Sequence, residues 1–246
     1  MDYVLETSGR RHVLVANRFR ELVNEHIFTP SYWMARDALG DPLGGRGSAW
    51  RIQDSLQGET IDWVLRNYLR GGMVRHLVHD RYFFSGLEKT RPWCEFMLLL
   101  EMRDQGLPVP EVVAARIDRG ALSYRGSLIT ATLPGESLTA RVLAGKLADP
   151  VWQAVGRTIA RFHQAGIWHA DLNANNILLD LSASEPDIHL IDFDRARRRD
   201  IKPDWQQANL DRLLRSLEKE TRDEPSAAAR VTTGWAMLKK GYSGQG

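Results

Sequence analysis

Cysteine is almost absent from this chain of 246 residues. Cys94 is the only one, so no intrachain disulfide can form, and a reducing compartment is the natural expectation. Long apolar runs are also missing. The longest, Phe96–Leu100, is far below the roughly 20 residues that span a bilayer, and the N-terminal residues lack the apolar core of a signal peptide. Any contact with a membrane is therefore expected to be peripheral.

The chain also has little net charge. Its 33 Lys and Arg residues nearly balance 31 Asp and Glu residues, and the formal charge of +2 does not indicate a nucleic-acid-binding protein. The basic residues are nevertheless clustered, in a tight group at Arg195–Arg199 and a looser one between Arg66 and Arg81. Such clusters suit a phosphate-rich ligand or an anionic membrane surface. For the Arg197–Arg199 run, a solvated basic surface is an equal alternative.

The hydrophobic pattern changes along the chain and predicts an α+β fold in two lobes. The segment up to about Leu56 is loosely patterned. Strands are expected at 63–69, 109–117 and 127–132, with a helix from about Arg91 that ends at Gly106 and Pro108. After the breaking segment Leu133–Glu136, the pattern predicts helices at 152–162 and 205–219 and short strands at 177–179 and 188–191. We expect a sheet-rich lobe at 1–132 and a small helical lobe at 133–246, with residues 241–246 frayed.

The most informative segment reads His-Ala-Asp-Leu-Asn-Ala-Asn-Asn-Ile-Leu-Leu at 169–179, followed downstream by Ile-Asp-Phe-Asp at 191–194. Its spacing matches the pattern H-R-D-L-x-x-x-N with a later D-F-G-like step. Phosphoryl transfer needs a carboxylate to orient the acceptor hydroxyl and hard oxygen ligands for Mg²⁺. The motif therefore predicts Asp171 as the catalytic carboxylate and Asn176 and Asp192 as magnesium ligands, in a cleft between two lobes of a protein-kinase-like fold.

Two weaker signals concern the nucleotide. Gly44–Ser48 is glycine-rich, and Gly45, Gly47 and Ser48 are candidates for a loop whose backbone N–H groups cover the phosphates of ATP, although an ordinary turn fits equally well. A kinase uses a strand Lys paired with a helix Glu to grip these phosphates. No Lys precedes Lys89 here, but Arg66 lies on an expected strand and Glu95 on the following helix. Arg can supply the same charge with a planar fork.

Beyond this core, the sequence resembles the 3-deoxy-D-manno-octulosonic acid (Kdo) kinases of lipopolysaccharide biosynthesis, which are related to the heptose kinases and, more distantly, to aminoglycoside phosphotransferases. The matching segments are G-R-G-S at 45–48, L-R-N-Y-L-R-G-G at 65–72, D-R-Y-F-F at 80–84, G-L-P-V-P at 106–110, the two motifs above, and W-x-x-x-N-L-x-R-L-x-R-S-x-x-K-E at 205–220. They cover most of the chain from about Gly45. The first forty residues match least and receive no role.

The resemblance implies that ATP phosphorylates Kdo at its 4-hydroxyl on a Kdo-lipid A precursor, with ATP and Mg²⁺ as cofactors. It implies the roles given above for Asp171, Asn176 and Asp192, and it has Arg66 contacting phosphates while Glu95 holds it. It also implies a peripheral protein on the cytoplasmic side of the bacterial inner membrane, with no nucleic-acid partner and no obligate protein partner.

The residues around the catalytic motif indicate which kind of acceptor is phosphorylated. Few residues follow Asp194, and no activation segment with an A-P-E anchor is visible, so a protein acceptor is not expected. Arginines are hypothesised to bind the Kdo carboxylate or a lipid A phosphate; the candidates are Arg70, Arg75, Arg81, Arg195 and Arg197. The helix at 205–220 is expected to pack on the catalytic loop, with Arg212 or Arg215 able to reach the substrate. The alternatives are another sugar kinase, for heptose or an aminoglycoside, and a nucleotide-binding pseudokinase scaffold.

Overall fold

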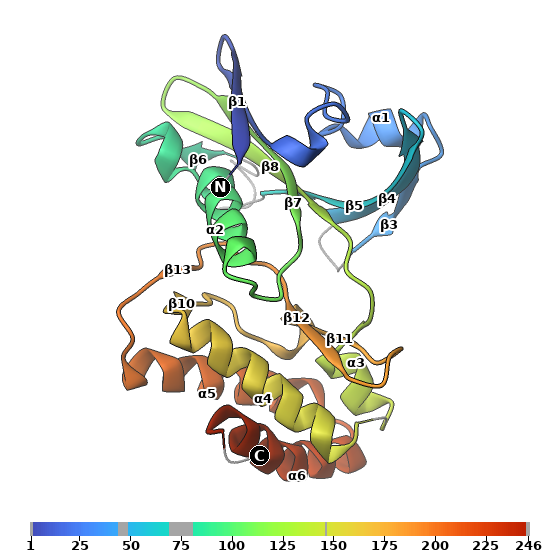
Figure 1. Ribbon diagram of the computed structural model, residues 1–246, viewed down its shortest axis with the longest axis vertical. Helices are drawn as coiled ribbons and strands as arrows, with labels where there is room; N and C mark the ends of the chain where they lie inside the picture. The colour runs from blue at the N-terminus through green and yellow to red at the C-terminus, as the bar shows by residue number, and fades with distance from the viewer. Residues whose placement is uncertain (1, 44–48, 69–80, 146, 245–246) are drawn as a thin grey trace. The chain divides into compact units, whose positions relative to one another are not determined.

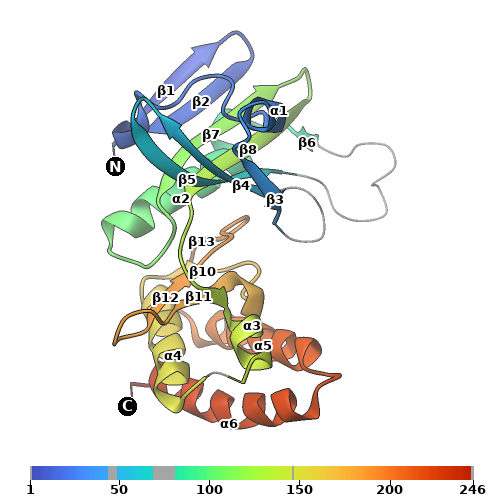
Figure 2. The same cartoon turned by 90° about the vertical axis from the view of Figure 1, so that its right-hand side faces the viewer.

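The computed structural model describes residues 2–43, 49–68, 81–145 and 147–244 and divides into two compact units. Unit 1 comprises Met1–Asp104 and Pro110–Thr132, and unit 2 comprises Gln105–Val109 and Leu133–Gly246. Figures 1 and 2 show that strands dominate the first, coloured blue to green, and helices the second, coloured yellow to red. The predicted α+β fold class, with a sheet-rich part followed by a helical part, is confirmed.

Unit 1 is built on an eight-stranded antiparallel sheet. Its strands are β1 (Tyr3–Ser8), β2 (Arg11–Ala16), β3 (Leu39–Pro42), β4 (Ala49–Leu56), β5 (Glu59–Asn67), β6 (Tyr82–Phe83), β7 (Val112–Arg119) and β8 (Ser123–Ala131). The order is β1-β2-β7-β8-β5-β4-β3, and β6 pairs with the start of β8. The strands predicted from aromatic and branched residues at 63–69, 109–117 and 127–132 correspond to β5, β7 and β8.

One helix, α2 (Arg91–Asp104), packs against β7 and β8. It buries Phe96, Leu99 and Met102, the apolar stripe that predicted it. The N-terminal elements, by contrast, were not predicted; besides β1 to β3 they are η1 (Asn17–Phe19) and α1 (Pro30–Met34), and η3 (Leu87–Lys89) precedes α2. In β1 the last four residues are exposed, so the edge strand shows no alternation of apolar and polar residues.

Unit 2 combines four helices with two small sheets. The helices are α3 (Leu138–Leu143), α4 (Asp149–Gln164), α5 (Pro203–Glu220) and α6 (Pro225–Tyr242), with a short turn η4 (Ala174–Asn176). One sheet has the order β12-β11-β9, and the other pairs β10 with β13. The strands are β9 (Glu136–Ser137), β10 (Ile167–Trp168), β11 (Ile177–Asp180), β12 (Asp187–Leu190) and β13 (Arg197–Arg198). The expected strands at 177–179 and 188–191 and helices at 152–162 and 205–219 are confirmed.

Small residues allow α4 and α6 to pack closely along their length. A Cβ at Gly156 of α4 would collide with the main chain of α6 at Leu238 and Tyr242, so only glycine fits there. Helix α6 was not predicted, because small residues replace the leucine stripe that marked α5. The expectation that 241–246 is frayed was wrong for its first residues, since α6 continues through Tyr242. Among the described residues, no helix is long and apolar enough to cross a membrane.

His163 of α4 is buried at the junction of three helices. Its Nδ1 lies 2.8 Å from the hydroxyl of Tyr242 in α6, and its ring stands edge-on to Trp205 of α5. Burial lowers the pKa of His163 to about 4, and an interaction with the side chain of Asn209 opposes this shift only in part. The folded protein therefore holds a neutral imidazole at neutral pH, while the unfolded chain takes up a proton at about pH 6.5.

We predict that this difference makes the protein less stable in mild acid. Between the two pKa values the unfolded chain binds the extra proton, so stability contributed by neutral His163 is lost as pH falls. Lowering the pH from 7 to 5 should reduce the free energy of unfolding by about 2 kcal/mol through this group, measured by urea unfolding. The variant His163→Gln should lack this part of the pH dependence, and His26→Gln, at an exposed histidine, should keep it. An unchanged pH dependence in His163→Gln would contradict the prediction.

Candidate active site

The β11–β12 hairpin brings the two predicted magnesium ligands to the same place in the chain fold. Ile177, the first residue of β11, pairs with Leu190, the last residue of β12. Asn176 directly precedes the first strand and Asp192 follows the second by two residues. The pairing continues past the strands, because the N–H of Ile191 donates to the carbonyl of Asn176 at 3.0 Å. Antiparallel pairing therefore places both predicted ligands at one end of the hairpin.

His169 connects this hairpin to the segment that carries Asp171. Its Nε2 lies 3.0 Å from the carbonyl oxygen of Ile191, and its Nδ1 lies 3.1 Å from the N–H of Asp171. A carbonyl only accepts and an N–H only donates, so the ring is neutral, with its hydrogen on Nε2. Burial, the largest influence, lowers the pKa of His169, while the charges of Asp171 and Asp192 act in the opposite direction. The ring therefore stays neutral and keeps both hydrogen bonds.

One face of α5 contacts the segment that carries the predicted catalytic residue Asp171. Asn209 is buried and makes two bonds to His169, accepting from its N–H at 3.3 Å and donating to its carbonyl at 2.9 Å. The hydroxyl of Ser216 accepts from the N–H of Ala174 at 2.9 Å. Together with Trp205 and Arg212, these residues follow the spacing i, i+4, i+7, i+11 of a single helix face. The expected packing of this helix on the catalytic loop is confirmed.

Arg212 binds the carboxylate of Asp171 directly. Its Nε and Nη2 both donate to Oδ1, at 2.9 and 2.5 Å, and each side chain is about half exposed, at 49% and 48%. Burial acts to raise the pKa of Asp171, but the hydrogen bonds and charge of Arg212 outweigh it and hold the pKa below its usual value. Both bonds use the same oxygen, so Oδ2 remains the atom that can accept from another ligand.

The donors at Asn176 and Asp192 have the chemistry that Mg²⁺ prefers. The amide nitrogen of Asn176 donates to the carbonyl of Asp171 at 3.0 Å, which leaves its Oδ1 as the oxygen able to bind a cation. Asp192 has a φ of 61°, in the left-handed region, and the next side chain, Phe193, is buried against Phe162. No group of three or more His, Cys, Asp or Glu side chains among the described residues is arranged to hold a metal ion. A cation here would also need ligands from phosphate or water.

In unit 1, the predicted pair on β5 and α2 is formed. Arg66 donates through Nη2 to Oε1 of Glu95, and the hydroxyl of Tyr68 donates to Oε2 at 2.6 Å. Glu95 is only 3% exposed at its side chain, so both carboxylate oxygens are held away from bulk water by these donors. Burial, reinforced by the charge of Glu95, raises the pKa of Tyr68 well above its usual value, so the phenol stays protonated and donates.

Several predicted residues lie outside the part of the chain that the structure describes. They are Gly45, Gly47 and Ser48 of the proposed phosphate-covering loop, and Arg70 and Arg75 of the arginine cluster. The sequence did not predict the contribution of Asn209, which bonds to the main chain of His169. Arg212 or Arg215 was predicted to reach the substrate; the structure shows that Arg212 bonds to Asp171. The signal was present in the spacing of polar residues along α5, which coincides with the helix face on the catalytic loop.

Comparison with known proteins gives a consistent family. The model of the lipopolysaccharide kinase (Kdo/WaaP) family matches residues 31–242. A 3-deoxy-D-manno-octulosonic acid kinase of Xylella fastidiosa (strain 9a5c) is 42% identical over 88% of this chain and 83% of that protein. A protein of the same name from Stenotrophomonas maltophilia (strain R551-3) is 44% identical, again over 88% and 83%.

A solved structure shares the fold. The chain is similar to WaaP in complex with acyl carrier protein, with a TM-score of 0.52, 18% sequence identity, and coverage of 97% of this chain and 99% of that one. At this identity the likeness concerns the fold alone. The prediction of a kinase-like fold is confirmed.

The contact between Arg212 and Asp171 gives a testable titration. Replacing Arg212 with Gln removes the cation that stabilises the ionised carboxylate, so the pKa of Asp171 should rise and the carboxyl should take up its proton at a higher pH. Arg212→Lys, which keeps the charge, should show a smaller rise. Carbon-13 NMR titration of Asp171 measures both, and Arg215→Gln, at an exposed position on α5, is the matched control. A pKa of Asp171 unchanged in Arg212→Gln would refute the assignment.

Proposed function

Because the chain belongs to the lipopolysaccharide kinase (Kdo/WaaP) family, we propose that it is an ATP-dependent sugar kinase that phosphorylates Kdo on a Kdo-lipid A precursor during lipopolysaccharide core biosynthesis. The observation that carries this proposal is the anchored carboxylate of Asp171, one oxygen bonded to Arg212 and the other available to a hydroxyl, in the same segment as Asn176. The names of the curated relatives support Kdo as the acceptor.

In the proposed reaction, Asp171 orients the acceptor. Its Oδ2 accepts a hydrogen bond from the sugar hydroxyl, assigned to the 4-position by family analogy, and takes the proton as the oxygen bonds to the γ-phosphorus of ATP and ADP departs. A carboxylate whose pKa is lowered is a weak base, which suits a loose transition state in which the proton moves late. Arg212 keeps the carboxylate ionised and fixes which oxygen faces the acceptor.

The proposed magnesium site uses Asn176 and Asp192. Their amide and carboxylate oxygens are hard ligands, and two protein ligands are enough where triphosphate oxygens and water complete the coordination. When bound, the ion would neutralise charge on the triphosphate. His169 and the hairpin end hold these two residues in register with Asp171, as the hydrogen bonds to Ile191 and Asp171 indicate.

We assign Arg66 to the nucleotide phosphates, with Glu95 as the residue that holds it. The guanidinium of Arg66 is permanently charged. Glu95, which bonds to both Arg66 and Tyr68, restricts the rotamers of the Arg66 side chain. Gly45, Gly47 and Ser48 are proposed to cover the phosphates through their backbone N–H groups. This assignment makes Arg66 the counterpart of the strand lysine of other kinases.

The central prediction concerns Asp171→Asn. It should lower kcat on a Kdo-lipid A precursor by about 10²–10⁴-fold, the usual effect of removing an acid–base group, while Mg-ATP affinity is largely retained because Asp171 serves the acceptor. Arg66→Gln should instead weaken Mg-ATP binding. Radiolabelled phosphate transfer and calorimetric titration measure the two effects, and Asp180→Asn, at the far end of β11, is the matched control.

The same assay separates the alternatives. Transfer to a heptosylated core or to an aminoglycoside, with none to the Kdo acceptor, would identify a different sugar kinase. Mg-ATP binding without transfer to any sugar would identify a nucleotide-binding scaffold. A near-normal rate in Asp171→Asn would remove that residue from the mechanism.

We further propose that the protein works peripherally on the cytoplasmic face of the inner membrane, where ATP and a lipid-anchored acceptor meet. The end of the β7–β8 hairpin supports this. Leu122 is 74% exposed and Phe83, on the neighbouring β6, is 70% exposed. Arg119 lies over Phe84, and its N–H donates to the carbonyl of Arg10 at 2.8 Å. Exposed apolar side chains beside cations are typical of proteins that bind the surface of an anionic membrane.

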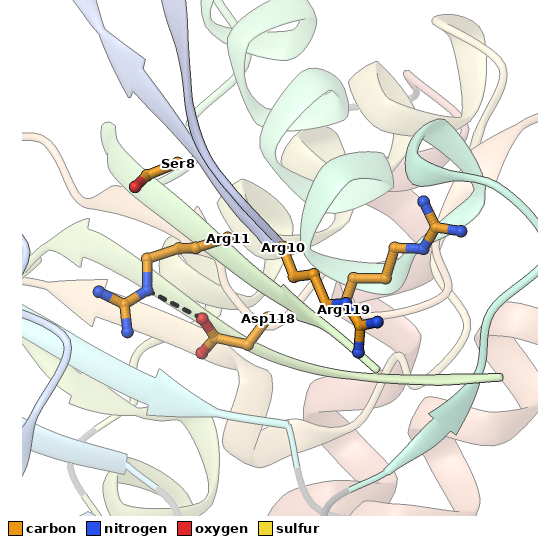
Figure 3. Close-up of a pocket in the computed structure, with 5 residues that line it drawn as sticks. All are labelled: Ser8, Arg10, Arg11, Asp118 and Arg119. Carbon is orange, nitrogen blue, oxygen red and sulfur yellow. Dashed lines mark hydrogen bonds and ion pairs between the residues drawn. The ribbon is translucent and has the colours of Figure 1, made fainter. Parts of the chain in front are cut away.

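Arg119, at the end of β7, and Arg10, in the turn between β1 and β2, are two cations available to lipid phosphates. Arg10 and Arg119 line a pocket of about 270 Å³. Arg11, which lines the same pocket, is bonded to Asp118 at 3.0 Å, and Figure 3 shows these side chains. Within the part of the chain that the structure describes, Arg10 and Arg119 form no ion pair. Their charges are therefore not neutralised locally.

We predict that Phe83→Ser combined with Arg119→Gln weakens partitioning onto vesicles of phosphatidylglycerol and phosphatidylethanolamine at least about tenfold, since an arginine near an anionic surface alone accounts for roughly fivefold. Sedimentation of protein with vesicles measures this. Met34→Ser, which removes another exposed apolar side chain, should have little effect. If the double variant sediments like the unaltered protein, another surface must contact the membrane.

A further inference from the structure

A two-stranded element next to the catalytic segment carries an unusual group of side chains. β10 pairs with β13 so that Trp168 is opposite Arg197, and the pairing extends one step because the N–H of Arg199 donates to the carbonyl of Gly166 at 2.8 Å. Alternate residues of an extended chain share a face. Arg197 and Arg199 therefore lie on the same side as Trp168, and both guanidinium carbons stand over its ring, at 5.2 and 4.0 Å.

Arg198, the middle residue of the Arg197–Arg199 run, makes a different contact. Arg198 points to the other side of the strand, where its Nη1 donates to the carbonyl of Ala165 at 2.9 Å. It thus closes the element onto the end of α4, which ends at Gln164. Arg198 therefore has a structural role, whereas Arg197 and Arg199 stack on the indole of Trp168.

Arg197 and Arg199 keep their charge without a local counter-ion. Arg197 is exposed and Arg199 partly exposed, and among the described residues no carboxylate forms an ion pair with either. Other arginines form ion pairs with a carboxylate, as Arg212 does with Asp171. Stacking on an aromatic ring uses the face of a guanidinium and leaves its in-plane N–H donors directed outward.

The position of this group links it to the reaction centre of the same unit. Trp168 directly precedes His169, whose ring bonds to Ile191 and Asp171. Arg197 follows Asp192 by five residues. The chain between them turns back at Arg195, whose φ is 62°. The same short segments that carry the proposed catalytic and metal-binding residues thus continue directly into the two unpaired cations.

We propose that Trp168, Arg197 and Arg199 form an oxyanion-binding site for the acceptor, in which the two guanidinium groups bind one acidic group of the glycolipid. The inference rests on the proposed function for the identity of the acceptor. The indole restricts the arginine rotamers before binding, so less side-chain entropy is lost when the anion arrives. Two charge-assisted, multidentate donors suit a phosphate or a carboxylate equally.

Two groups on the acceptor have this chemistry, the carboxylate of the acidic sugar and a phosphate on the lipid-bearing sugars. The site is assigned to the oxyanion chemistry that both groups share. Three acceptors distinguish the carboxylate from the phosphate: the intact Kdo-lipid A precursor, the precursor without its lipid phosphates, and the precursor with its Kdo carboxylate converted to a methyl ester. A variant that has lost the site should have the same acceptor KM as the unaltered protein only for the acceptor that lacks the group bound at the site.

The test uses Arg197→Gln/Arg199→Gln in the full chain. The acceptor KM should rise at least tenfold, the lower range for lost hydrogen bonds between charged groups, while kcat and the KM for ATP stay close to those of the unaltered protein. Trp168→Leu should raise the acceptor KM by a smaller factor, because the arginines remain but are less ordered. Arg222→Gln, an exposed arginine at the end of α5, removes a charge elsewhere and should leave the acceptor KM unchanged.

The outcomes are separable. No transfer by the unaltered protein would refute the proposed function, and the site would then be tested by binding of fluorescent Kdo-lipid A precursor to the unaltered and double-variant chains. Normal transfer by the unaltered protein with an unchanged acceptor KM in the double variant would overturn the inference. So would a rise in the KM for ATP alone, since the arginines would then serve the nucleotide.

Discussion

The neutral imidazole of His169 is the constraint on which the proposed reaction centre in unit 2 depends. It accepts from the main chain at Asp171 and donates to the main chain at Ile191, so one ring fixes two loops. A protonated ring could no longer accept from Asp171, and burial prevents that protonation. Asn209 then secures the main chain of His169 itself. The main chain at Asp171 and the end of the β11–β12 hairpin are thereby held in one geometry by uncharged hydrogen bonds.

Within each unit, the described arginines are held in two ways. Where an arginine has a structural or positioning task, it is paired, as Arg66 is with Glu95 and Arg212 with Asp171. Where it faces solvent beside the catalytic segment, as Arg197 and Arg199 do, it is stacked on an aromatic ring instead. Pairing fixes a cation and reduces its field, whereas stacking fixes it and leaves its field intact. Stacking therefore leaves Arg197 and Arg199 able to attract an anionic ligand, while pairing fixes the side chains of Arg66 and Arg212.

The sequence predicted the parts that follow from strong periodicity or from rigid spacing. The leucine stripe predicted α5, and the branched residues predicted β5, β7 and β8, all of which are present. The motif at 169–179 predicts Asp171 and Asn176 as site residues, and these roles stay predictions. The sequence did not reveal α6, whose close packing at Gly156 depends on small residues and not on an apolar stripe. Nor did it reveal that Arg212 bonds Asp171, because contacts between residues forty positions apart depend on how α5 packs. The roles of Gly45, Gly47 and Ser48 stay predictions.

The β11–β12 hairpin has a consequence for how this protein tolerates change. Its two strands have four residues each, and the proposed magnesium ligands Asn176 and Asp192 lie at the end away from the connecting turn. Insertions or deletions in that turn, at 181–186, leave the opposite end undisturbed. A slip of one residue between the strands would instead carry Asp192 out of step with Asn176 and turn buried Ile188 and Leu190 towards solvent. The length of the turn can therefore vary, whereas the register of the two strands is fixed by their buried side chains.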